Sequence, residues 1–371
     1  MRVATGLATG AVAKPEIAAE AVKRAMAKAN IHAPSSVLLF LTSEFASDPQ
    51  SAIKAAAKAT SCTQIIGCSA SGIFTEEDWV LDGAAAAAMV FSDEVNLTVA
   101  DANCSAPLIL TLAAPNAINS TWLNKPILNK PVARFGGVSG DATGHGPFSV
   151  WQNGKGATQG YCELVIHNAE VAVAASHGLK SISKPQKITQ THGYDVLSIA
   201  NIHALASLTA AWQKQQKTDD SSYQPLPYHR LTAMVASKSA QLERGDYHIA
   251  SIIAGNEENA SVTLTKALNE GDWLSWAVRD VDSAQMDIVK TASTLKQQLN
   301  SEPEFALLFS CLGRGPYFYD GGDQDLALLK TLFPKLPIIG FYGNGEIAPI
   351  QGANELLQYS AVLALCAKAA N

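Results

Sequence analysis

The sequence predicts an α/β protein of two related halves, each a mixed β-sheet packed with helices. Three observations lead to this fold class. The chain has 371 residues and is 47% hydrophobic, which is enough to bury large cores. Short apolar runs alternate with segments of helical character, a pattern typical of α/β folds. The order strand, helix, strand, glycine-rich loop, strand occurs near both ends of the chain, and we interpret it as an internal duplication.

The duplicated segment runs from Val37 to Phe91 in the first copy and from Ala306 to Leu365 in the second. Each copy begins with an apolar run, passes through a helical stretch, and reaches an Ile-Ile-Gly sequence that opens a glycine-rich loop. Glycine tolerates positive φ and lets a ligand approach the backbone closely, so both loops are candidate ligand contacts. The alanine run at residues 84–88 favours a helix locally. We still predict a strand there, because its counterpart in the second copy has strand character.

Other elements surround these two copies. We predict a strand over residues 2–8 and a helix that begins at Pro15, because proline suits the first turn of a helix. Residues 134–146 hold five glycines around Asp141 and form a third candidate ligand loop. The pair Asn153-Gly154 predicts a hairpin. Further strands are expected at residues 95–101, 160–167, 170–175, 231–235, 247–253, 261–265 and 273–278, with helical faces at 202–212 and 288–299.

The best candidate for a linker is the polar, proline-containing segment of residues 214–227. We therefore predict two domains, residues 1–220 and residues 221–371.

Composition excludes several classes of protein. The formal net charge of −6 argues against nucleic acid as the main partner. Six cysteines without a C-x-x-C pair predict reduced thiols rather than a zinc site or a disulfide framework. Because no apolar run reaches about 18 residues, we expect no membrane span. These observations together predict a cytoplasmic protein.

Several motifs resemble those of the FIST family (F-box and intracellular signal transduction proteins). In the first half they are Ile66-Gly67-Cys68-Ser69 with Gly72, Phe135-Gly136-Gly137 with Gly140-Asp141, and Ser176-His177-Gly178. In the second half they are the longer stretches Phe309–Gly315 and Gly340–Ile347. The resemblance covers nearly the whole chain, as an N-terminal and a C-terminal FIST domain. It implies a sensory protein for small ligands, with amino acids proposed as ligands; some members resemble haem-based nitric oxide sensors.

Two charged residues in the second half are the leading candidate contacts. Arg314 offers a planar fork that matches a carboxylate, and Glu346 could hold an ammonium group, so the pair would grip both ends of an amino acid. The alternative is structural: the two residues pair with each other, or Arg314 pairs with Asp320, and they only stabilise the fold. Asp141 could likewise serve only to form a turn or cap a helix. The candidate ligand-binding residues are Arg314, Glu346, Asp141, Cys311, Cys68, Ser69, Gly137, Gly343, Asn344 and Tyr342.

We therefore expect a sensory protein that holds an amino acid or a similar small polar ligand in a cleft between the two halves. No signalling output module is visible after Leu365, so the signal would pass through a separate partner. No cofactor is expected on this hypothesis. One alternative is a haem-binding nitric oxide sensor with His177, His145 or His192 as iron ligand. The other is a hydrolase or transferase that uses Cys311 or Cys68, although a catalytic cysteine needs a base nearby.

Overall fold

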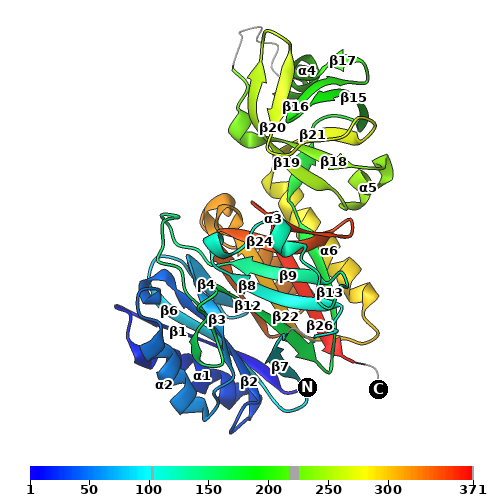
Figure 1. Ribbon diagram of the computed structural model, residues 1–371. Helices are drawn as coiled ribbons and strands as arrows, with labels where there is room; N and C mark the ends of the chain where they lie inside the picture. The colour runs from blue at the N-terminus through cyan, green and yellow to red at the C-terminus, as the bar shows by residue number, and fades with distance from the viewer. Residues whose placement is uncertain (102–103, 217–224, 370–371) are drawn as a thin grey trace. The chain divides into compact units, whose positions relative to one another are not determined.

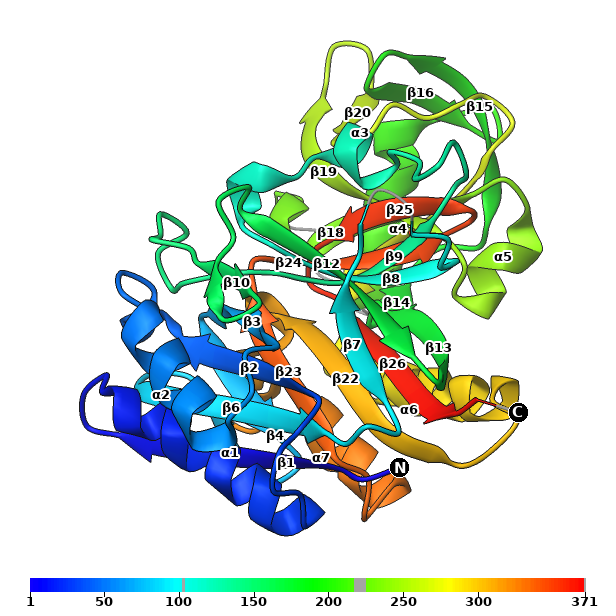
Figure 2. The ribbon, with the colours of Figure 1, turned by 60° about the horizontal axis from the view of Figure 1, so that its bottom comes forward.

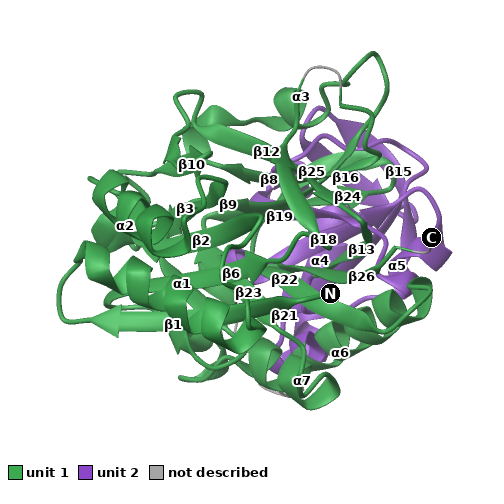
Figure 3. Cartoon of the chain, turned by 90° about the horizontal axis from the view of Figure 1, so that it is seen from below, with its two compact units in different colours: residues 1–176, 285–371 green, residues 177–284 purple. Residues whose placement is uncertain are grey.

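The computed structural model describes residues 1–101, 104–216 and 225–369. The chain forms two compact units (Figure 3). Unit 1 comprises Met1–Ser176 and Gln285–Asn371, and unit 2 comprises His177–Ala284. Unit 2 is therefore inserted into the chain of unit 1. The domain boundary expected at 220/221 falls in residues 217–224, which lie outside the described residues.

The first sheet of unit 1 contains the first predicted copy. Its strand order is β1-β6-β2-β3-β10-β11, with β2 parallel to β3 and β6 antiparallel to β2. The alanine run is strand β6, as predicted: it is buried throughout and pairs with a strand on either side, which overrides its local helix propensity. Helices α1 and α2 cover one face of this sheet (Figure 2). The elements are β1 (Val3–Gly10), α1 (Pro15–Ala29), β2 (Ser36–Thr42), α2 (Gln50–Thr60), β3 (Ile65–Ala70), β6 (Ala84–Phe91), β10 (Val150–Gln152) and β11 (Lys155–Gly156).

The second sheet repeats this arrangement and confirms the duplication. Its order is β13-β26-β22-β23-β4-β5, with β22 parallel to β23 and β26 antiparallel to β22. Helices α6 and α7 pack against it, and α6 runs along β13 and β26 in Figure 1. The elements are β13 (Ala169–Ser176), α6 (Val281–Gln298), β22 (Pro303–Cys311), α7 (Gln324–Leu332), β23 (Ile338–Gly343), β26 (Ala361–Lys368), β4 (Gly72–Thr75) and β5 (Trp79–Val80).

A third sheet has the same topology, which the sequence did not reveal. Its order is β25-β24-β9-β8-β12-β7, with β8 parallel to β9 and β12 antiparallel to β8. The short helix α3 packs against it. The elements are β7 (Asn96–Val99), β8 (Leu108–Ala113), α3 (Ser120–Leu123), β9 (Ala133–Val138), β12 (Tyr161–His167), β24 (Gly345–Ile350) and β25 (Ala353–Leu357). We name the three copies repeat A (residues 3–91), repeat B (residues 96–167) and repeat C (residues 169–176 and 281–368).

One glycine occupies the same place in all three repeats. A Cβ on Gly67 would lie 1.7 Å from the Leu39 carbonyl oxygen of the neighbouring parallel strand. A Cβ on Gly136 would lie 1.9 Å from the Thr111 carbonyl oxygen, and one on Gly340 would lie 1.8 Å from that of Leu308. Because no real Cβ fits at such distances, glycine is the residue that these positions require. The shared contact supports the equivalence of the three copies.

The repeats exchange hairpins in a cycle. Hairpin β4–β5, which follows β3 of repeat A, pairs with β23 of repeat C. Hairpin β24–β25, which follows β23 of repeat C, pairs with β9 of repeat B. Hairpin β10–β11, which follows β9 of repeat B and turns at the predicted Asn153-Gly154, pairs with β3 of repeat A. Each repeat therefore completes the sheet of another, and the exchange binds the three into one body.

The main core lies where the three sheets face one another. It gathers buried apolar residues from all of them, while the helices pack on the outer faces. Aromatic contacts join the sheets: the ring of Phe40 lies 5.0 Å from that of Phe341, and Phe135 lies 6.4 Å from Phe309. Strands buried on both faces explain the continuous apolar runs in the sequence.

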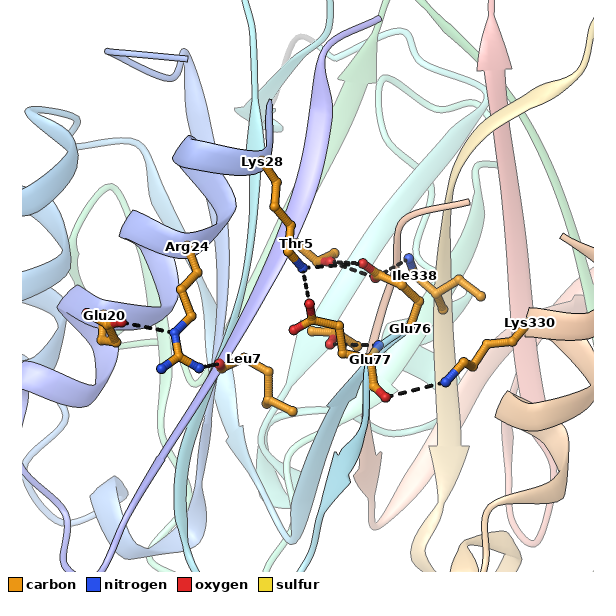
Figure 4. Close-up of polar contacts among 10 residues, drawn as sticks. Thr5, Leu7, Glu20, Arg24, Lys28, Glu76, Glu77, Lys330 and Ile338 are labelled. Atoms are coloured by element: carbon orange, nitrogen blue, oxygen red, sulfur yellow. Dashed lines mark hydrogen bonds and ion pairs between the residues drawn. The ribbon is translucent and has the colours of Figure 1, made fainter. Parts of the chain in front are cut away.

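A polar cluster fixes one of the exchanged hairpins, as Figure 4 shows. Glu76, in the turn between β4 and β5, accepts hydrogen bonds from the Thr5 hydroxyl of repeat A at 2.5 and 2.6 Å. The same carboxylate accepts the Ile338 amide of repeat C at 3.0 Å. Lys28 on α1 pairs with Glu77, and Lys330 on α7 donates to the Glu77 carbonyl oxygen at 3.3 Å. This cluster therefore connects repeats A and C through the hairpin.

Unit 2 is a closed ring of strands with a helix packed against its core. Strand β21 pairs with β15 and with β18, so the order β21-β15-β16-β20-β19-β18 returns to its start. Helix α4 contributes Ala204, Leu208 and Trp212 to the core of this unit. Its elements are β14 (Leu179–Ser181), β15 (Gln186–His192), β16 (Asp195–Ile199), β17 (Ile202–His203), α4 (Ala204–Gln216), β18 (Leu231–Ala236), α5 (Ser239–Arg244), β19 (His248–Asn256), β20 (Ser261–Leu264) and β21 (Trp273–Arg279).

Candidate functional site

The loops that follow β3, β9 and β23 meet inside unit 1. The Ser71 amide of repeat A donates to the Tyr342 carbonyl oxygen of repeat C at 3.1 Å. The Asn344 amide of repeat C donates to the Val138 carbonyl oxygen of repeat B at 3.1 Å. The Ser139 hydroxyl of repeat B closes the cycle by donating to the Ser69 carbonyl oxygen of repeat A at 2.6 Å. We call this junction the three-loop centre.

Two polar side chains at the three-loop centre face the same glycine. A Cβ on Gly140 would lie 2.8 Å from Asn344 Oδ1 and 2.9 Å from Ser71 Oγ. By strand register, these three residues occupy equivalent positions in repeats B, C and A. Ser71 is 9% exposed, and its hydroxyl has no hydrogen-bond partner among the described residues, whereas Asn344 is partly exposed. The centre thus presents a hydroxyl and a carboxamide, each able to donate and to accept hydrogen bonds.

Repeat B carries an insertion at this point. Residues 141–148 separate Gly140 from Ser149, whereas Ser71 and Asn344 each lead directly into the next strand of the exchanged hairpin. Asp141 accepts hydrogen bonds from the Thr143 hydroxyl and from the Gly144 amide, the latter at 2.7 Å. Burial alone would raise the pKa of Asp141, but these hydrogen bonds lower it overall, so the side chain is a carboxylate at neutral pH. Its contacts are those of a turn-forming aspartate.

Arg314 lies in a buried ion pair. It ends the short helix η4 (Leu312–Arg314) and is 1% exposed. Its Nε donates to Asp325 Oδ2 at 2.8 Å and its Nη2 to Asp325 Oδ1 at 3.1 Å, a bidentate pair. The Ser176 carbonyl oxygen and hydroxyl accept from the same guanidinium at 2.7 and 2.8 Å. The partner of Arg314 is therefore Asp325, rather than Glu346 or Asp320.

Glu346 is fully buried, and neither of its carboxyl oxygens has a hydrogen-bond partner within the part of the chain that the structure describes. Burial raises the pKa of Glu346 well above its ordinary value, against the opposing effects of the Ser360 backbone amide and the Arg314 charge. Burial therefore favours the neutral carboxylic acid over the carboxylate at this position. Arg314 thus pairs with Asp325, whereas the Glu346 carboxyl has no hydrogen-bond partner among the described residues.

The Tyr342 side chain connects the loop after β23 with the start of α7. Its hydroxyl donates to Asp323, whose other carboxyl oxygen accepts the Leu326 amide at 2.9 Å and so caps α7. The Tyr319 hydroxyl donates to Asp325 at 2.8 Å. Burial, followed by the nearby Asp325 charge, raises the pKa of Asp323 to about 6. Asp323 and Asp325 were missed by sequence reasoning; the signal was two acids at the start of a predicted helix.

The remaining predicted contacts have packing roles. A Cβ on Gly137 would lie 2.6 Å from the Phe341 ring, and one on Gly343 would lie 2.1 Å from the Val138 carbonyl oxygen. Ser69 accepts the Ser149 amide at 3.0 Å and lies 3.1 Å from the Ser139 hydroxyl. These residues therefore shape the three-loop centre rather than present free polar groups to it.

The two candidate cysteines are buried. Cys68 lies in the main core, and burial raises the pKa of its thiol well above the ordinary value, with a further contribution from Cys162. A nucleophilic cysteine requires the opposite shift. Cys311 ends β22, is 7% exposed, and donates its backbone amide to Ser360 at 3.0 Å.

The three candidate histidines belong to two different units. His145 is exposed in the insertion of unit 1, and His192 is exposed at the end of β15 in unit 2. His177 is buried in unit 2, with its ring 4.9 Å from that of Tyr247. Over the described ranges, no group of three or more metal-ligating side chains occurs.

Within those same ranges, no helix has the length and apolar character needed to cross a membrane.

Comparison with known sequences identifies the family. The FIST N domain matches residues 35–201, and the FIST C domain matches residues 207–349. The chain belongs to the FIST family. It is 24% identical over 235 residues to an uncharacterized protein of Mycobacterium bovis, covering 63% of this chain and 60% of that protein. It is 23% identical over 234 residues to one of Mycobacterium tuberculosis, covering 62% and 60%. It is 32% identical over 134 residues to F-box only protein 22 of Homo sapiens, covering 31% and 32%.

The match therefore spans about three-fifths of the length of the mycobacterial relatives. FIST domains are associated with sensory signal transduction. The two FIST domains do not coincide with the two compact units, since FIST N ends and FIST C begins within the inserted unit 2. All three loops of the three-loop centre belong to unit 1.

Proposed function

We propose that this FIST protein binds an amino acid or a similar small polar molecule at the three-loop centre and signals through a separate partner in the cytoplasm. The observation that carries the proposal is the convergence of Ser71 and Asn344 on Gly140. A buried hydroxyl without a partner is costly to leave unsatisfied, so a ligand that pairs with it recovers that cost. Asn344 is the partly exposed member of the set, so we expect the ligand to enter beside it.

The chemistry of the centre favours a small ligand with both donors and acceptors. A ligand ammonium can donate to Asn344 Oδ1 and Ser71 Oγ, and a ligand carboxylate can accept from the Asn344 amide group or the Ser71 hydroxyl. Repeat B contributes Gly140, whose lack of a side chain lets the other two approach. We assign Arg314 and Glu346 a structural role next to this centre, because both are buried and Arg314 pairs with Asp325.

A thermal-shift screen of individual amino acids tests the proposal. We expect at least one amino acid to raise the melting temperature of the wild-type protein. Ser71→Ala and Asn344→Ala should each lower the affinity for that amino acid by about two- to tenfold, the effect of losing one neutral hydrogen bond. Ser92→Ala is the matched control, because Ser92 is also buried and its hydroxyl also has no partner among the described residues.

The proposal fails if no amino acid stabilises the protein, or if Ser92→Ala weakens the ligand as much as Ser71→Ala does. The haem and cysteine alternatives stay predictions with tests of their own. A stoichiometric Soret band in the absorption spectrum would establish haem. Rapid labelling of one cysteine by a thiol-reactive probe at neutral pH would favour the enzyme.

A further inference from the structure

The two chain segments that lead into unit 2 are held by one side chain of unit 1. The chain leaves unit 1 after Ser176, at the end of β13, and returns in α6. Arg314 donates to both the carbonyl oxygen and the hydroxyl of Ser176. The Ser176 hydroxyl in turn donates to Asp287 on α6 at 3.0 Å. A single guanidinium thus binds the departing segment directly and the returning segment through Ser176.

The same guanidinium is connected to the loop that carries Asn344. Its partner Asp325 lies two residues from Asp323, which accepts the hydroxyl of Tyr342. The backbone that follows Arg314 packs on the Tyr342 ring, since a Cβ on Gly315 would lie 3.0 Å from Tyr342 Cδ1. Two residues beyond Asn344, the Arg314 charge lowers the pKa of the Glu346 carboxyl, against the larger effect of burial. Residues on both sides of Asn344 therefore interact with Arg314, either directly or through Asp323 and Asp325.

Charge makes this connection sensitive to small movements. Arg314 interacts with the carboxyl groups of Asp325 and Asp287, and its pair with Asp325 lies between fully buried side chains. In a buried network, moving one partner changes the balance among the others, because water does not screen them. A shift of the Tyr342–Glu346 loop would therefore alter how firmly Arg314 holds Ser176.

We propose that Arg314 is a positioning residue that couples the ligand loop at Asn344 to the two segments through which unit 2 is attached. This inference rests on the proposed function, in which a ligand at the three-loop centre is what moves the loop. It adds the route by which occupancy of that centre reaches unit 2. Coupling of this kind is a shared free energy between two sites and shows as non-additivity of substitutions at its two ends.

A double-mutant cycle tests the coupling without a known ligand. Tyr342→Phe removes the hydroxyl bond on the loop side and keeps the ring. Ser176→Ala removes the hydroxyl bond on the unit 2 side. Amide hydrogen exchange is measured in residues 177–181 and 279–287. We expect Tyr342→Phe to speed exchange at residues 279–287 about threefold or more in the wild-type background. It should have little effect there in the Ser176→Ala background, which keeps only the bond between Arg314 and the Ser176 carbonyl oxygen.

The control cycle uses Tyr317→Phe, the same chemical change in the neighbouring helix η5 (Pro316–Tyr319). The Tyr317 hydroxyl is exposed and bonds Asp82 instead of the Arg314 cluster, so its effect should add to that of Ser176→Ala. Ser176→Thr keeps a hydroxyl and should restore the response to Tyr342→Phe, which a merely structural loss would not predict.

Additive effects of Tyr342→Phe and Ser176→Ala would overturn the coupling. So would a Tyr317→Phe and Ser176→Ala control cycle that is as non-additive as the Tyr342 cycle. Failure of the amino-acid screen would overturn the proposed ligand site and leave this result standing. In a second arm, a pool of the twenty amino acids serves as the probe. It should slow exchange at residues 279–287 in the wild type and should not do so in Ser176→Ala.

Discussion

Arg314 shows how a residue that suggests a ligand contact can serve the fold instead. An arginine in a glycine-rich loop is an expected carboxylate binder, but here the carboxylate is Asp325, eleven positions along the chain. Removing one partner of a buried pair leaves the other uncompensated and typically costs about 3–5 kcal/mol. Loss of ligand binding in Arg314→Ala would therefore report damage to the fold. Ser71 and Asn344 give the cleaner test, because neither side chain holds another element in place.

Asp323 carries a pH dependence that follows from its burial. Its pKa is raised to about 6 from an ordinary value of 3.8, first by burial and then by the Asp325 charge. The folded state thus binds this proton more tightly than the unfolded state. The stabilisation is fully present below the ordinary pKa and is lost as the pH rises through about 6. We expect the free energy of unfolding to fall by on the order of 1–3 kcal/mol over this window from this group.

Urea unfolding at several pH values, with Asp323→Asn as the reference, isolates this contribution. Asparagine keeps an acceptor for the Leu326 amide and mimics the neutral carboxyl, so other titrating groups cancel in the difference between the two proteins. The wild type should lose stability relative to the variant as the pH rises from about 4 to 7. A constant difference across this range would show that Asp323 does not titrate there.

At the scale of elements, the three glycines beside parallel-strand carbonyl oxygens test the equivalence of the repeats. Replacing Gly67, Gly136 or Gly340 by alanine places a Cβ within 1.9 Å of a backbone oxygen, so the paired strands must separate. We expect each variant to lose about 1–3 kcal/mol of stability or more, the cost of substitutions that force packed backbone to shift. Gly136→Ala should be the worst, because its φ of +146° also disfavours a side chain.

The comparison residue is Gly83, where an added Cβ would meet no atom within 4 Å. Gly83→Ala should leave the chemical denaturation midpoint nearly unchanged or raise it slightly, through the unfolded state. If one of the three glycine positions accepts alanine as Gly83 does, that repeat is not equivalent to the others in its strand packing.

The elements also show what a sequence can and cannot reveal about this fold. Repeats A and C share Ile-Ile-Gly and long apolar strands, so their duplication was readable. Repeat B was hidden because its strand begins with Ala133-Arg134, its helix α3 has only 4 residues, and residues 141–148 interrupt its loop. Each of the three glycine-rich loops was recognisable from the sequence as a candidate ligand contact. Their cyclic closure depends on hairpin exchange, which leaves no local pattern in the chain.

At the scale of the molecule, unit 1 is complete without unit 2. Its three sheets, their shared core and the hairpin exchange draw only on residues of unit 1. Unit 2 likewise closes its own ring of strands around a separate core. The family domains divide the chain within unit 2, so a cut at the family boundary would separate β16 from β20, which are paired. Unit 1 should therefore be isolated by removing the insertion rather than by cutting the chain at the family boundary.

The ends of that insertion are already joined. The Asp280 amide donates to the Gly178 carbonyl oxygen at 3.4 Å, and Leu179 pairs with Arg279. Replacing residues 179–279 by a turn of about two residues should therefore close the chain without strain. Asp280 is kept, because its carboxylate accepts the amide and hydroxyl of Ser283 at 2.9 and 2.7 Å in the first turn of α6.

We expect the protein that lacks residues 179–279 to fold as one cooperative unit, because every contact that joins the three repeats is retained. Circular dichroism in the near ultraviolet should show fixed aromatic packing, and urea unfolding should show a single transition. The thermal response to any ligand found with the full chain should persist, since Ser71, Gly140 and Asn344 all belong to unit 1. A product with helical and strand signals but no fixed aromatic packing would mean that unit 1 depends on unit 2 for its core. The repeats would then not be the autonomous body that their hairpin exchange implies.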